Sequence, residues 1–89
     1  MKNNTTTARV RQRLGTTQEG LAHLLGVSFP TINSWERGRS VPRKENAEHL
    51  AILERVLEAH SAESVRAVLE GNQGSRGRLF AALVRLTTN

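Results

Sequence analysis

Residues 16–38 read TTQEGLAHLLGVSFPTINSWERG, and this stretch decides the fold. Its first half carries leucine and alanine at helical spacing, which predicts a short amphipathic helix. Gly26 follows, where a chain leaving a helix needs a left-handed residue, and Ser28 is a good N-cap for a second helix. Pro30 falls in the first turn of that helix, where a backbone N–H is not needed. The stretch therefore predicts two short helices joined by a tight turn.

The second of these helices has two different faces. Ile32 and Trp35 lie three residues apart and form an apolar face directed at the core. The opposite face carries Pro30, Asn33, Ser34 and Arg37. A short helix that is fixed on one side and polar on the other is suited to contact a partner.

The pattern TQ-x-x-LA-x-x-x-GVS-x-x-x-I-x-x-WE-x-G-x-x-x-P spans residues 17–42 and resembles the lambda-repressor/Cro-like (XRE) helix-turn-helix family. Matching helices before and after it extend the resemblance to residues 8–59. The resemblance implies an all-α fold, a compact bundle of five to six short helices around a central helix-turn-helix. It also implies a sequence-specific transcriptional regulator that binds double-stranded DNA. In this family the second helix of the motif enters the major groove, and dimers read two half-sites about one helical turn apart.

The resemblance assigns roles to individual residues. The residues expected to contact bases, on helix 28–36, are Phe29, Pro30, Thr31, Asn33 and Ser34. Phe29 and Pro30 cannot form the bidentate bonds that read guanine or adenine, so we expect them to pack on thymine methyl groups. Packing of Phe29 on the motif's own turn is the alternative. Asn33 is the only one of the five with the amide geometry suited to adenine. Relatives also pair an arginine of the first helix with the glutamate of WE-x-G, which implies an ion pair between Arg11 and Glu36.

A second set of residues is expected to contact phosphates and to raise affinity without reading sequence. It comprises Gln18, Ser28, Arg37, Arg39, Arg43 and Lys44. The charge distribution agrees with this expectation. Residues 1–44 hold eight basic and two acidic residues, whereas residues 45–89 hold five basic and six acidic ones. The positive charge therefore accompanies the motif, as binding to a polyanion requires.

The rest of the chain is expected to divide into three parts. Residues 1–7 are polar and predict a flexible arm, residues 8–71 form the DNA-binding domain, and residues 75–88 predict an amphipathic C-terminal helix. Three roles are open for that last helix: it packs on the domain's own core, it mediates self-association, or it binds a membrane surface. Of these we do not expect the membrane role. Within the domain we expect a helix from residue 42 or 43 to residue 59. Its expected buried stripe is Ala47, Leu50, Ala51, Leu53 and Leu57.

Composition argues against other function classes. The chain has no cysteine, no tyrosine and no aspartate, and its three histidines lack metal-ligand spacing. We therefore expect no enzyme, no cofactor and no metal site. No apolar run approaches the ~20 residues that are needed to span a bilayer, and no signal-peptide segment is present. We therefore expect a cytoplasmic, nucleoid-associated protein. The alternative function is a protein-interaction module or antitoxin. Its C-terminal helix would bind a partner such as a toxin, with DNA binding autoregulatory or secondary.

Overall fold

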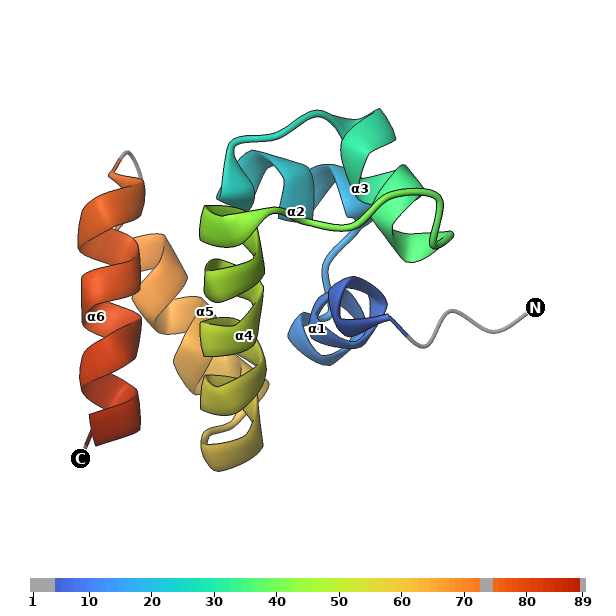
Figure 1. Cartoon of the computed structure of the whole chain (residues 1–89). Coiled ribbons are helices and arrows are strands. Elements are labelled where there is room, and N and C mark those ends of the chain that lie inside the picture. Colours follow the sequence, from blue (N-terminus) through green and yellow to red (C-terminus); the bar gives the residue numbers. More distant parts are fainter. Residues whose placement is uncertain (1–4, 73–74, 89) are drawn as a thin grey trace.

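The computed structural model describes residues 5–72 and 75–88, and these ranges contain six α-helices and no strand. The helices are α1 (Thr6–Leu14), α2 (Gln18–Leu25), α3 (Phe29–Glu36), α4 (Lys44–Ala59), α5 (Ala62–Gly71) and α6 (Arg76–Thr88) (Figure 1). The predicted all-α bundle with a central helix-turn-helix is confirmed.

The N-terminal arm is shorter than predicted. Thr5 is the N-cap of α1, and its hydroxyl accepts a hydrogen bond from the N–H of Ala8 at 3.1 Å. Thr6 and Thr7 already belong to the helix, because this cap satisfies one of the amides of the first turn. The remainder of the predicted arm, residues 1–4, lies outside the described residues.

The turn between α2 and α3 follows the local rules that the sequence indicated. Gly26 ends α2 with a φ of 71°, a conformation that side chains with a Cβ rarely adopt. Ser28 begins α3, and its hydroxyl accepts from the N–H of Thr31 at 3.3 Å. Pro30 lies in the first turn. These residues set the angle at which α3 leaves α2.

Helix α4 is the centre of the bundle, with α1 packed on one side and α6 on the other (Figure 1). Leu50, Leu53, Val56 and Leu57 are buried along it. Ala47 and Ala51, which were expected in this stripe, are exposed instead. They line an open groove together with Val41 and with residues 5–7 at the start of α1, which leave this part of α4 uncovered.

The C-terminal helix packs on the chain's own core. Leu79, Phe80 and Leu83 of α6 are buried, so most of its apolar stripe is covered inside the molecule, whereas Val84 stays exposed. The ring of Phe80 stacks on that of His49 from α4, with centroids 3.8 Å apart and ring planes 7° apart. Arg76 approaches Glu45 at 3.6 Å at the start of α6.

This packing makes protonation of His49 less favourable. Its Nδ1 atom is buried and has no hydrogen-bond partner among the described residues. Burial lowers the pKa of the His49 imidazole, and the charge of Arg76 acts in the same direction, whereas Glu45 and Glu48 oppose the shift. The folded protein therefore binds a proton at His49 less readily than the unfolded chain does.

We expect the free energy of unfolding to decrease as the pH falls below the ordinary histidine pKa of 6.5, because protonation favours the unfolded chain. Melting temperatures between pH 7.5 and 5 measure this effect. His49→Phe keeps an aromatic ring against Phe80 and should flatten the pH profile in this range. His23→Phe, at an exposed position on α2, is the matched control and should keep the acid-side decrease. An unchanged profile in His49→Phe would assign the decrease to other groups.

Candidate DNA-binding interface

Helix α3 is held on one face and presented on the other. Ile32 and Trp35 are buried in the core, as the sequence predicts. Phe29 keeps 45% of its surface exposed and Pro30 is exposed as well. The first turn of α3 therefore offers an apolar surface to a ligand, while its inner face fixes the helix to the bundle.

The three polar side chains expected to contact bases each have a hydrogen-bond partner. The Thr31 hydroxyl lies 2.8 Å from that of Ser28, and the Ser34 hydroxyl lies 2.8 Å from that of Ser40. Asn33 donates from Nδ2 to Oε1 of Gln18 at 3.3 Å. The outward polar side chains of α3 are thus positioned before any ligand arrives.

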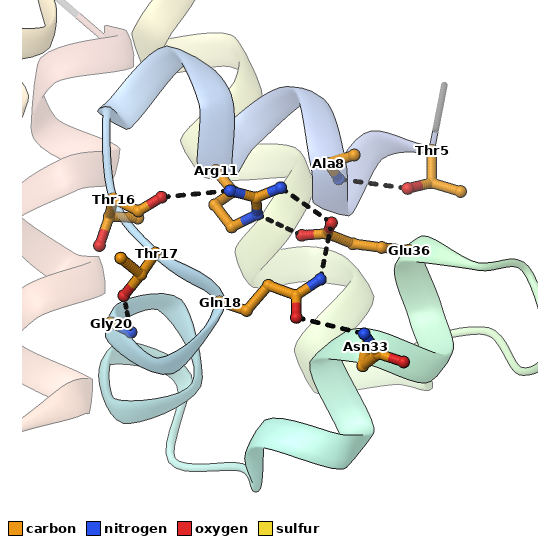
Figure 2. Close-up of polar contacts among 9 residues, drawn as sticks. All are labelled: Thr5, Ala8, Arg11, Thr16, Thr17, Gln18, Gly20, Asn33 and Glu36. Carbon is orange, nitrogen blue, oxygen red and sulfur yellow. Dashed lines mark hydrogen bonds and ion pairs between the residues drawn. The ribbon is translucent and has the colours of Figure 1, made fainter. Parts of the chain in front are cut away.

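A buried ion pair ties α1 to the end of α3. Nε of Arg11 donates to Oε2 of Glu36 at 2.5 Å, and Nη2 donates to Oε1 at 3.0 Å (Figure 2). Gln18 of α2 donates from Nε2 to the same Oε1, also at 3.0 Å. Glu36 is only 2% exposed. Its hydrogen bonds raise the pKa of the Arg11 guanidinium, because they favour the charged form.

Beyond α3 the chain turns sharply and exposes four basic side chains. Gly38 has a φ of 76°, and the N–H groups of Gly38 and Arg39 bond back to the carbonyls of Trp35 and Ser34 at 3.2 and 3.0 Å. Arg43 is the N-cap of α4, and its side chain makes no cap hydrogen bond. The exposed basic residues from this loop to the start of α4 are Arg37, Arg39, Arg43 and Lys44. None of them forms an ion pair within the described part of the chain.

Most of the base-contacting and phosphate-contacting candidates thus lie on α3 or in the segment that follows it, whereas Gln18 begins α2 and Ser28 is the N-cap of α3. A helix-turn-helix family model matches residues 8–56, more than half of the chain. The chain belongs to the XRE-type, lambda-repressor/Cro-like helix-turn-helix family. The curated proteins and the solved structures compared with it gave no match.

Members of this family bind DNA. Among the described residues, no group of three or more histidine or acidic side chains is placed to hold a metal ion. None of the helices in residues 5–72 and 75–88 is both long and apolar enough to cross a bilayer.

The sequence did not predict two of the contacts in this helix-turn-helix. Ser40 was not a candidate residue, yet its hydroxyl contacts Ser34. The signal was Gly38, since a left-handed turn after a helix returns the chain towards the last turn of that helix. Gln18 was expected at a phosphate, and both ends of its amide are hydrogen bonded inside the motif. The phosphate contact of Gln18 stays a prediction.

Replacing Glu36 by Gln should lower the free energy of unfolding by about 2–3 kcal/mol, because it leaves the buried part of Arg11 without its charged partner. Thermal unfolding measures the loss, which corresponds to a fall in melting temperature of roughly 10–20 °C for a domain of this size. Glu54→Gln is the matched control, since Glu54 pairs with Arg9 of the same helix α1 at 2.8 Å on the surface. We expect it to lose less than about 1 kcal/mol. Equal losses in both variants would contradict a special role for the buried pair.

Proposed function

We propose that this protein is a sequence-specific, double-stranded-DNA-binding transcriptional regulator that acts as a dimer and inserts α3 into the major groove. The observation that carries the proposal is the division of α3 into two faces. Its inner face is anchored by Ile32, Trp35 and the ion pair of Glu36. Its outer face carries oriented polar side chains and is followed directly by exposed basic residues.

Base recognition in this proposal rests on the outer face of α3. Asn33 reads an adenine, since its amide can both donate to N7 and accept from the N6 amino group. Thr31 and Ser34 add hydroxyl contacts. Phe29 and Pro30 pack on thymine methyl groups, which their exposure at the start of the helix permits. A site rich in A·T pairs follows from this set of side chains.

Phosphate contacts in this proposal come from the turn that follows α3 and from helix N-termini. Arg37, Arg39, Arg43 and Lys44 supply the charge, and Ser28 adds a contact at the start of α3. The predicted phosphate contact of Gln18 is not part of this proposal, because both ends of its amide are hydrogen bonded to Glu36 and Asn33. The N-terminus of α4 strengthens the attraction, because its amides have no side-chain cap.

Dimerisation is proposed because α3 is short. A helix of eight residues reaches only a few base pairs, so one copy distinguishes few sequences. A symmetric pair reads two half-sites and doubles the information. An antitoxin function based on α6 is not favoured by any observation, since Leu79, Phe80 and Leu83 are buried within this chain.

Selection of bound sites from random duplex DNA at near-physiological salt tests the proposal. We expect enrichment of an inverted repeat whose half-site centres lie about 10 base pairs apart or a multiple of that spacing. Enrichment of a single short half-site would remove the dimer from the proposal. Recovery of no preferred sequence would contradict sequence-specific binding.

Neutralising Arg39 or Arg43 should weaken binding to all sequences alike. Each of the variants Arg39→Gln and Arg43→Gln should reduce the slope of log K against log salt by about 0.9 for the phosphate contact it removes. Arg55→Gln is the control: it removes the same charge at an exposed position of α4, about 16 Å along the helix from Lys44. An equal change in the control would mean that net charge, and not this segment, governs affinity.

A further inference from the structure

Four side chains from the first three helices form one continuous hydrogen-bonded series, which we call the polar link. It runs from Arg11 of α1 to Glu36 of α3, on to Gln18 of α2, and back to Asn33 of α3 (Figure 2). Its inner end is the buried ion pair, and its outer end is the residue proposed to read adenine. A role of the polar link in reading DNA rests on the proposed function.

The chemistry of the inner end fixes the direction of every bond in the polar link. The Arg11 guanidinium can only donate, and the Glu36 carboxylate can only accept. The atom of Gln18 that contacts Glu36 must therefore be Nε2, which leaves Oε1 facing Asn33. Since Oε1 can only accept, the contacting atom of Asn33 must be Nδ2. The two amides, whose oxygen and nitrogen atoms could otherwise exchange places, each have one orientation.

This orientation determines what Asn33 has left for a ligand. One N–H of Nδ2 is used by Gln18, so the second N–H and Oδ1 remain. Figure 2 shows Oδ1 on the side away from Gln18. One donor beside one acceptor is the pattern that complements N7 and the N6 amino group of adenine in the major groove. The rotated amide would exchange these two positions and place the donor where the acceptor is needed.

We propose that Gln18 is the positioning residue of the recognition helix, and that it sets the amide of Asn33 for adenine through the polar link. The hydroxyls of Thr31 and Ser34 are hydrogen bonded to serines only three and six residues away in the sequence. Asn33 alone among the three is bonded to another helix, and through it to a buried charge. Its geometry is therefore inherited from the packing of α1, α2 and α3, and not only from α3.

A phosphate contact by Gln18 makes a different prediction, which allows a decisive test. Losing a phosphate contact weakens all sequences alike and lowers the salt slope, whereas losing a positioning residue relaxes the preference at one base pair. Gln18→Met keeps the length of the side chain and removes both of its hydrogen bonds in the polar link. Gln12→Met, an exposed glutamine of α1, is the matched control.

The experiment measures dissociation constants of the full chain for the selected site and for sites changed at each base pair, with Asn33→Ala locating the base pair that Asn33 reads. We expect Gln18→Met to lose about tenfold in preference at that same base pair and to keep the wild-type salt slope. The double variant Gln18→Met/Asn33→Ala should lose no more base preference than Asn33→Ala alone, because both substitutions remove the same coupled contact. Thermal unfolding verifies that each variant is folded.

Two results would overturn the inference. If Gln18→Met binds all sequences more weakly and its salt slope falls by about 0.9, Gln18 is a phosphate contact. If Gln18→Met keeps the wild-type preference at the base pair that Asn33 reads, Gln18 does not position Asn33. A measurement without DNA separates this inference from the proposed function. We expect the side-chain amide resonances of Asn33 in the free protein to shift in Gln18→Met and to stay in Gln12→Met. If the wild-type protein selects no DNA site, both the proposed function and the reading of adenine by Asn33 are contradicted. The Asn33 amide resonances would still show whether Gln18 positions the Asn33 side chain.

Discussion

The arrangement of the proposed DNA-binding face depends on one buried ion pair. Glu36 closes α3 at a position where water is excluded, so its charge requires the two donors of Arg11 and the amide of Gln18. Such a pair adds little to stability beyond offsetting its own desolvation. Its contribution is geometric, because it admits a single mutual placement of three helices. The outward side chains of α3 acquire their directions from that placement.

The sequence predicted the features that follow from local chemistry. Gly26 and Ser28 act through the backbone of their own turn, so their effects can be read without knowing the neighbours. The partner of Arg11 came from the resemblance to a family, because no local rule joins residues 25 positions apart. The polar link could not be predicted, since the contact of Gln18 with Asn33 depends on the angle between α2 and α3. Ala47 and Ala51 were misplaced for the same reason: helical periodicity gives an apolar face, and only the neighbours decide how much of it is covered.

Positive charge is concentrated in the segment that follows α3, where Arg37, Arg39, Arg43 and Lys44 lie within eight residues. The basic side chains that follow α3 make no ion pair within the described residues. By contrast, the paired charges on the rest of the surface, such as Arg9 with Glu54, join one helix to another. This local excess of positive charge is what the proposed contact with phosphates requires.

The position of α4 between α1 and α6 means that the family motif is not a folding unit on its own. The matched segment, residues 8–56, ends inside α4 and omits Val65 of α5 and the buried side chains of α6. A polypeptide cut at residue 56 would keep every residue proposed to contact DNA and would uncover one wall of its core. Such a fragment would favour aggregation over binding. Recombination that transfers the helix-turn-helix to another protein must therefore carry the two C-terminal helices with it, or supply an equivalent apolar cover.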